Sequence, residues 1–194
     1  MQVKKEEIRQ KILDVAEDEF LKRGYEGASM RIIAKKANTT LGNIYHYFPN
    51  KEALLVELLT PTLDNLDIGL ANHLKLTDIS YTLQDLIDYI DRYEQGEDFE
   101  ELDFLLDKKI VILLELNSSS LLAKKQKLLD EFSDHLSWHL GMGEKDGSYS
   151  KIIINMVTDC IKQALLENET FIETRKEFIK LFRFFCTGIA TRYK

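Results

Sequence analysis

Residues 24–54 constrain the fold of this 194-residue chain more than any other stretch. They hold two short helical patterns, the first capped by Ser29 and the second by Thr40, whose hydroxyls can accept a hydrogen bond from a free backbone N–H. Asn38 tolerates the left-handed conformation that ends the first helix, and Pro49 stops the second. The second helix is too short and too polar to be mainly a core element. The stretch therefore predicts a helix-turn-helix.

The rest of the chain has a helical pattern. Hydrophobic residues make up 44% of it, with two prolines and nine glycines, and few apolar runs alternate. We predict an all-α fold of about nine helices, with a helix-turn-helix domain over residues 1–50 and a larger domain over residues 51–194. Pro61 removes one backbone hydrogen bond, so we expect it to kink the fourth helix or split it in two. The expected helices cover about residues 4–23, 30–37, 41–47, 51–76, 82–96, 98–116, 121–141, 150–167 and 170 to near the C-terminus. Asn50 is expected to cap the fourth, and capping boxes at 98–101 and 170–173 to open the sixth and the ninth.

Positive charge is concentrated around the helix-turn-helix. Between Phe20 and Lys51 there are six basic residues and one acidic residue, a net charge of +5. Residues 52–194 hold 16 basic and 26 acidic residues, a net charge of −10, and the whole chain carries −7. This asymmetry predicts that the small basic part meets a polyanion and that the larger acidic part does not.

Composition also narrows the class of protein. Cys160 and Cys186 fall in apolar helical stretches and are predicted to be buried free thiols. The first residues lack the apolar segment of a signal peptide, and the longest apolar runs are too short for a membrane span, so we expect a soluble cytoplasmic protein. No nucleophile elbow, phosphate-binding loop or paired-cysteine site is found. We therefore expect neither enzymatic activity nor a cofactor.

The second helix of the helix-turn-helix carries residues suited to reading DNA, because this helix lies in the major groove in such motifs. Thr40 presents a hydroxyl and free N–H groups, and Gly42 would let the backbone come close to DNA. Asn43 can pair with an adenine edge or reach a phosphate, and Leu41 can touch a thymine methyl group. The donors expected to contact phosphate oxygens are Tyr45, His46 and Tyr47.

Two cations stand where a helix dipole disfavours them. Arg31 and Lys51 lie in the first turns of two predicted helices, where acidic side chains are favoured. A phosphate between each helix end and its cation would account for both, so we predict phosphate contacts at Arg31 and Lys51. The alternative is three packed helices with a solvated basic face, in which Tyr45 and Phe48 are partly core.

These residues resemble the N-terminal signature of the TetR-type bacterial transcriptional regulators. The resemblance covers about residues 5–65, and its spacing holds without insertion. Asn38 departs from it, since a glycine is common there, and so does Leu41, where a polar residue is frequent. The matching positions are Gly24, Tyr25, Ser29, Ile33, Ala34, Ala37, Thr40, Gly42, Tyr45, Phe48, Lys51 and Leu54.

The resemblance implies a homodimer on double-stranded DNA. Each recognition helix would enter one major groove of a palindromic operator, with half-sites roughly 34–36 Å apart or a little more. A small molecule bound by the larger domain would reorient the fourth helix and change the spacing of the two DNA-reading heads.

The last two predicted helices are apolar over more than one face, whereas a helix packed only on its own core needs a single apolar stripe. The resemblance implies that this pair forms a four-helix bundle with its copy in a partner subunit. The alternative is a fully buried hairpin in a monomer. The predicted interface residues are Ile153, Val157, Cys160, Ile161, Ala164, Phe178, Phe182, Phe185 and Ile189.

An effector pocket is expected among the fourth to eighth helices. Its walls would be mostly apolar, which favours a hydrophobic small molecule, although aromatic and aliphatic residues at helical spacing also form ordinary core. The candidate lining residues are Leu66, Leu70, Tyr89, Phe104, Leu105, Ile112, Leu113, Trp138 and Met156.

One further cluster consists of residue types that bind zinc. Glu131, His135 and His139 recur at i, i+4 and i+8 on one helix face, but no fourth ligand is evident and their neighbours are polar, so we expect no metal there. The leading function is a ligand-responsive, homodimeric repressor. The alternative is a DNA-binding structural or adaptor protein of the same fold that needs no effector.

Overall fold

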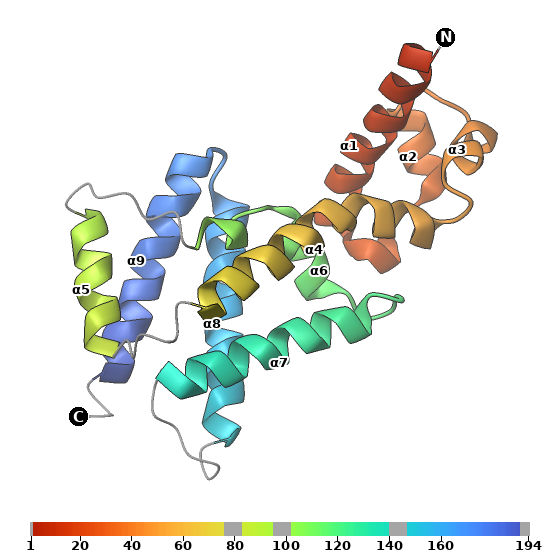
Figure 1. Ribbon diagram of the computed structural model, residues 1–194. Helices are drawn as coiled ribbons and strands as arrows, with labels where there is room; N and C mark the ends of the chain where they lie inside the picture. Colours follow the sequence, from red (N-terminus) through yellow and green to blue (C-terminus); the bar gives the residue numbers. More distant parts are fainter. Residues whose placement is uncertain (1, 76–82, 95–101, 140–146, 191–194) are drawn as a thin grey trace. The chain divides into compact units, whose positions relative to one another are not determined.

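The computed structural model of the chain describes residues 2–75, 83–94, 102–139 and 147–190 (Figure 1). This part of the chain is all-helical and contains no strand, which confirms the predicted fold class. No helix within it is long and apolar enough to cross a membrane. The elements are α1 (Gln2–Gly27), α2 (Met30–Lys36), α3 (Leu41–Tyr47), α4 (Lys51–Lys75), α5 (Leu83–Glu94), the 3₁₀ helix η2 (Asp103–Leu105), α6 (Lys109–Glu115), α7 (Leu122–His139), α8 (Gly147–Glu167) and α9 (Phe171–Ala190).

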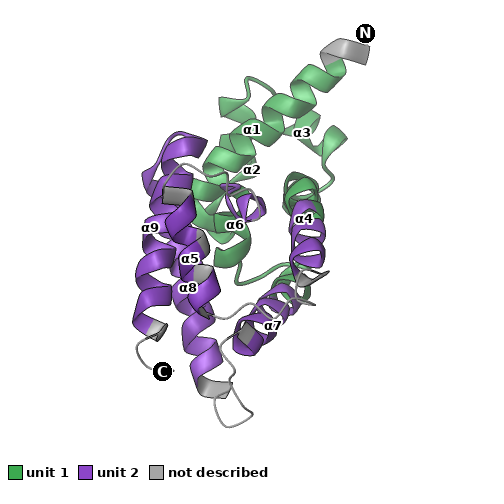
Figure 2. Cartoon of the chain, turned by 60° about the vertical axis from the view of Figure 1, so that its left-hand side comes forward, with its two compact units in different colours: residues 1–64, 109–125 green, residues 65–108, 126–194 purple. Residues whose placement is uncertain are grey.

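The chain divides into two compact units (Figure 2). Unit 1 comprises residues 1–64 and 109–125, and unit 2 comprises residues 65–108 and 126–194. Helix α6 and the start of α7 therefore belong to the same unit as the helix-turn-helix, although they are far from it in sequence. The boundary that we predicted after residue 50, between the helix-turn-helix domain and the larger domain, stays a prediction.

Unit 1 is built around one apolar core and one buried carboxylate. The regular part of α1 ends where Gly24 takes a positive φ of 70°, which a glycine adopts without steric cost. Glu19 is fully buried in α1, and its oxygens lie 2.8 Å from Arg23 Nε and 2.6 Å from Lys36 Nζ. A buried carboxylate needs such partners, so this cluster joins α1 to the end of α2. The largest fully buried side chains of unit 1 are Ile12, Phe20, Ile33, Ile44, Phe48, Leu54, Leu55, Leu59 and Leu116.

The predicted turn and two of the three predicted side-chain caps around the helix-turn-helix are confirmed. Asn38 has a φ of 52°, and it separates α2 from α3. Thr40 Oγ1 accepts a hydrogen bond from the Asn43 N–H at 3.1 Å, and Asn50 Oδ1 accepts one from the Ala53 N–H at 2.7 Å. Ser29 occupies the N-cap position of α2 but makes no side-chain cap bond.

Two predictions on helix boundaries differ from the structure. Helix α4 is one helix through Pro61, so the predicted split is wrong, while the predicted kink stays a prediction. Leu59 and Leu63, on either side of the proline, are both buried. The single helix expected from 98 to 116 is instead η2 followed by α6, and Leu105 and Leu106 are buried where the helix is interrupted. The capping box predicted at 98–101 lies outside the described residues.

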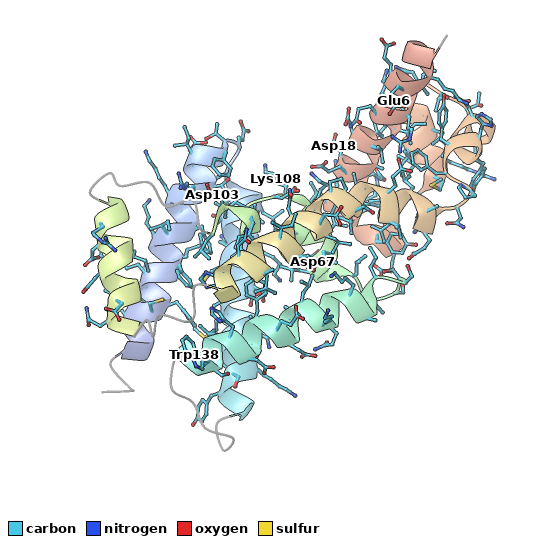
Figure 3. The ribbon with its side chains drawn as sticks, in the orientation of Figure 1. Glu6, Asp18, Asp67, Asp103, Lys108 and Trp138 are labelled. Atoms are coloured by element: carbon cyan, nitrogen blue, oxygen red, sulfur yellow. The ribbon has the colours of Figure 1, made fainter. Side chains whose placement is uncertain are left out.

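Unit 2 is centred on α8 and α9, which pack side by side, with α5 against α9 (Figure 1). The capping box that opens α9 is confirmed, since the Glu173 N–H donates to Thr170 Oγ1 and the Thr170 hydroxyl donates to the Glu173 carboxylate. Asp103 of η2 (labelled in Figure 3) lies 3.0 Å from Arg175 Nε. These contacts fix the start of α9.

The cysteines are free, as predicted, but only one is buried. Cys186 lies in the core, where burial, and secondarily the charge of a Cys160 thiolate, raises its pKa to about 12. Cys160 is half-buried. Both thiols are therefore poor nucleophiles at neutral pH.

Candidate DNA-reading face

Helix α3 has one buried side and one exposed side. Ile44 is fully buried and Phe48 is 1% exposed, so these two residues anchor the helix and its end to the core. Tyr45 is 46% exposed, and Thr40, Gly42 and His46 are exposed as well. Of the remaining predicted contact residues, Leu41, Asn43 and Tyr47 are half-buried. Because Ile44 and Phe48 hold α3 against the core, the opposite side of the helix forms an exposed, mostly polar surface.

Gly42 has no role in the packing of its own chain. A Cβ added at this position would meet no atom within 4 Å, and the residue has no positive φ. Glycine inside a helix costs about 0.5–1 kcal/mol relative to alanine. The fold therefore does not require a glycine here, whereas close approach of another molecule to the α3 backbone would.

Asn43 is held by two neighbouring threonines. Its backbone N–H donates to Thr40 Oγ1, and its side-chain Nδ2 donates to Thr39 Oγ1 at 2.7 Å. Sequence reasoning missed Thr39, because the prediction treated the turn as a spacer. The i, i+4 spacing of a threonine and an asparagine was the available signal.

Of the six cations between Phe20 and Lys51, three bind groups of unit 1. Arg23 and Lys36 pair with Glu19, and Lys51 binds backbone carbonyls. The others have no hydrogen bond or ion pair within the described part of the chain, and all three are exposed: Lys22, Arg31 and Lys35. Arg31 thus remains available for the predicted phosphate contact.

Lys51 has a structural role that the sequence did not suggest. Its Nζ donates to the carbonyl oxygens of Tyr25 at 2.6 Å, Glu26 at 3.1 Å and Ala28 at 3.1 Å, and lies 4.5 Å from the centroid of the Tyr25 ring. An ammonium group has three N–H donors, so all are used within the protein. These bonds give the cation partners within unit 1, and the predicted phosphate contact of Lys51 stays a prediction.

Two carboxylates at the same place bind the segment between α6 and α7. Glu26 Oε1 accepts hydrogen bonds from the Asn117 N–H at 3.1 Å and from the N–H and hydroxyl of Ser118 at 2.9 and 3.0 Å. Glu52 Oε1 accepts from the N–H and hydroxyl of Ser120 at 2.8 and 2.6 Å. We call these contacts the carboxylate clasp. It fixes residues 117–120 to the ends of α1 and α4 that border the helix-turn-helix.

The clasp shifts the acidity of its members. Partial burial raises the pKa values of the Glu26 and Glu52 carboxyls. The hydrogen bonds that these carboxylates accept have a larger, opposite effect, so both pKa values lie below the ordinary value for glutamate. Tyr25 donates its hydroxyl to Glu52 Oε2 at 2.7 Å. Burial, that hydrogen bond and the Glu52 charge raise the pKa of Tyr25. Both carboxylates are therefore ionised at neutral pH.

The predicted interface residues lie mostly on the inner side of α8 and α9. Six of the nine are buried in the chain's own packing: Ile153, Ile161, Ala164, Phe178, Phe182 and Phe185. Val157 and Cys160 are half-buried, and nothing is described of the Ile189 side chain. The exposed large apolar side chains of these two helices include Ile152 at 54%, Met156 at 47% and Phe184 at 81%. Most of the predicted stripe thus packs within the chain itself, and the interface assignment stays a prediction.

The predicted pocket residues divide between the two units. Leu66, Leu70 and Leu105 are buried in unit 2, where Phe104 stacks on Phe132 with ring centroids 6.2 Å apart. Ile112 and Leu113 are buried in α6 of unit 1. Trp138 on α7 (Figure 3) and Met156 are about half exposed. Nothing is described of the Tyr89 side chain, so the pocket stays a prediction.

The cluster of Glu131, His135 and His139 is only partly described. Glu131 lies 3.5 Å from Lys127, and the His135 ring meets the His73 ring at a centroid distance of 4.7 Å. The His139 side chain lies outside the described part of the chain. No group of three or more metal-ligating residues is found among the described side chains.

Short capped helices, a buried anchor and an exposed polar face define a helix-turn-helix protein. Residues 12–58 match the family described as "Bacterial regulatory proteins, tetR family". The chain is 39% identical over 61 residues to the "HTH-type transcriptional repressor KstR" of Rhodococcus jostii, a match that covers 31% of this chain and 29% of that protein. It is 38% identical over 52 residues to the "HTH-type transcriptional regulator QacR" of Staphylococcus aureus, covering 27% and 28%. The chain therefore spans less than a third of the length of the curated relatives it matches.

The fold extends this similarity beyond the N-terminal helices. A TetR-family transcriptional regulator from Bordetella parapertussis superposes with a TM-score of 0.58 at 20% identity, covering 90% of this chain and 93% of that one. Residues 12–58 are thus similar to the TetR-type regulators, and the fold of the chain is similar to that of a TetR-family regulator.

Proposed function

We propose that the chain is a DNA-binding transcriptional repressor that acts in the cytoplasm as a homodimer on a palindromic operator. The observation that carries this proposal is the exposed face of α3, where Gly42 lies in open space beside polar side chains. Arg31 and Lys35 on α2 add exposed cations with no internal partner in the described structure. Together they supply backbone access, hydrogen-bonding groups and positive charge for one major groove.

The proposed repression and the proposed homodimer are supported by different observations. KstR is named a repressor, and its similarity to this chain lies in the DNA-reading third, which favours repression by operator occupancy. Dimerisation is supported by the apolar side chains left exposed on α8 and α9, because such surfaces on soluble proteins are usually covered by a partner. A palindrome would then match the two-fold symmetry of the dimer.

We further propose that unit 2 binds a hydrophobic small molecule that weakens DNA binding. The support is the resemblance together with the apolar side chains of Leu66, Leu70, Phe104 and Leu105 in that unit. A panel of fatty acids and aromatic cations should contain a compound that raises the unfolding temperature and releases the DNA. If no class of hydrophobic compound does so, the adaptor alternative without an effector is favoured.

The experiment that tests DNA reading is selection from random duplexes by the purified protein. We expect one enriched inverted repeat, with half-sites roughly 34–36 Å apart or a little more. Asn43→Ala should still enrich the repeat but relax the preference at one base pair of each half-site. Enrichment of no sequence by the wild type would overturn the proposed function.

A further inference from the structure

We propose that Thr39, in the turn before the recognition helix, determines the base preference of Asn43 by holding its carboxamide in one orientation. The inference rests on the proposed function, since it concerns how the same face reads DNA. Thr39 is half-buried and would act through Asn43, so it is a positioning residue.

The backbone of Thr39 is fixed by the end of α2. The left-handed Asn38 turns the chain, and the Thr39 N–H then donates to the Ala34 carbonyl at 3.0 Å, while the Asn38 N–H donates to Lys35 at 3.2 Å. This pattern of two bonds closes a helix C-terminus. Ala34 is 4% exposed, so the position of Thr39 is tied to the core of unit 1.

The backbone bonds place the hydroxyl oxygen of Thr39 beneath the first turn of α3, where it accepts a hydrogen bond from Asn43. Asn43 Nδ2 donates one of its two N–H groups to Thr39 Oγ1 at 2.7 Å, and the Asn43 backbone N–H is bound by Thr40. The second side-chain N–H and the oxygen Oδ1 remain for a ligand. An adenine edge needs one donor and one acceptor, so the bond to Thr39 removes no group that the base requires.

Orientation decides which base this pair of groups can read. The terminal torsion of asparagine is broad and roughly two-fold, so an untethered carboxamide can exchange its donor and acceptor positions. The bond to Thr39 selects the arrangement with Nδ2 toward the turn. Without it, Asn43 would present either arrangement, and its discrimination between bases would fall.

The test compares Thr39→Val, which removes the hydroxyl, with Thr39→Ser, which keeps it. Competition between the selected operator and each single base-pair change gives the discrimination at every position. Thr39→Val should lose about tenfold in discrimination at one base pair of each half-site, the base pair that Asn43→Ala also affects. Thr39→Ser should behave as the wild type, and the double variant Thr39→Val with Asn43→Ala should lose no more than Asn43→Ala alone.

Other outcomes overturn the inference without touching the proposed function. Full discrimination by Thr39→Val, or a loss at a base pair that Asn43→Ala leaves unaffected, excludes positioning through Asn43. If Thr39→Val is unstable in thermal unfolding, NMR of the Asn43 side-chain amide in the free protein replaces it. Slow hydrogen exchange in the wild type and Thr39→Ser, but not in Thr39→Ala, supports the bond, and equal exchange in all three contradicts it. A wild type that selects no sequence would instead defeat the proposed function.

Discussion

Two helical glycines show how differently two surfaces of this molecule are built. A Cβ added at Gly42 on α3 or at Gly188 on α9 would meet no atom within 4 Å, so neither glycine is required by side-chain packing within the chain. The surface at Gly42 is polar, with Thr40 and His46 exposed, whereas Phe184, one helical turn before Gly188, is 81% exposed. The first surface suits a hydrated polyanion and the second suits another apolar helix. The difference indicates where the two proposed partners would approach: DNA at the polar surface and a second copy of the chain at the apolar one.

The largest expected effect comes from placing a charge on the apolar surface. Phe184→Glu should convert the dimer to a monomer and lower affinity for the full inverted repeat about 100-fold or more, because the two heads would no longer bind as one unit. Light scattering gives the mass, and fluorescence anisotropy gives the affinity. A second variant, Phe171→Glu, on a phenylalanine that is 50% exposed near the start of the same helix, measures whether the interface extends that far. An unchanged mass for Phe184→Glu would remove this surface from the interface.

The second prediction distinguishes the structural role of Lys51 from the DNA-binding role proposed for Arg31. Lys51→Ala should lower the free energy of unfolding by about 2 kcal/mol, because charge-assisted hydrogen bonds to three carbonyls are lost, and should leave the salt dependence of DNA binding unchanged. Arg31→Ala should do the reverse, reducing the salt slope by about one with little change in stability. Denaturant unfolding and anisotropy at several salt concentrations measure both. A reduced salt slope for Lys51→Ala would support the phosphate contact that the sequence suggested.

The two glycines can be compared directly by adding one methyl group to each. Gly42→Ala should stabilise the fold by about 0.5–1 kcal/mol and yet weaken operator binding about tenfold, with the dimer intact. Gly188→Ala should weaken the dimer and leave the base preference unchanged. The comparison fails if Gly42→Ala binds the operator as tightly as the wild type, since close approach to α3 would then be absent.

The smallest expected effect concerns the carboxylate clasp. Because the pKa values of Glu26 and Glu52 are lowered from 4.5 in the folded protein, their contribution to stability is present above about pH 4.5 and is lost as the pH falls through the folded values. The double variant Glu26→Gln, Glu52→Gln should be less stable than the wild type at pH 7. This difference should shrink on acidification, as measured by denaturant midpoints from pH 7 to pH 3. A difference that is constant over this range would show that the clasp does not depend on ionisation.

Features that depend on contacts between residues close in sequence were mostly predicted correctly, whereas those that depend on distant residues were not. Asn38, Thr40 and Asn50 act on backbone groups within a few residues, and all three fold as the sequence predicted. Lys51 binds carbonyls more than 20 residues away, so its neighbours in sequence gave no sign of that role. Helical periodicity likewise found two apolar faces on the last helices but could not decide which one packs inside the subunit. Phe182 and Phe184 differ by only two positions, yet one is 8% exposed and the other 81%.

The mass of the wild-type complex on its selected duplex tests the central claim most directly. The account predicts two chains on each inverted repeat and one chain of Phe184→Glu on a single half-site. Native mass spectrometry or light scattering with the purified complex gives these numbers. A single wild-type chain on the full repeat, or equal binding to unrelated duplexes, would contradict the account.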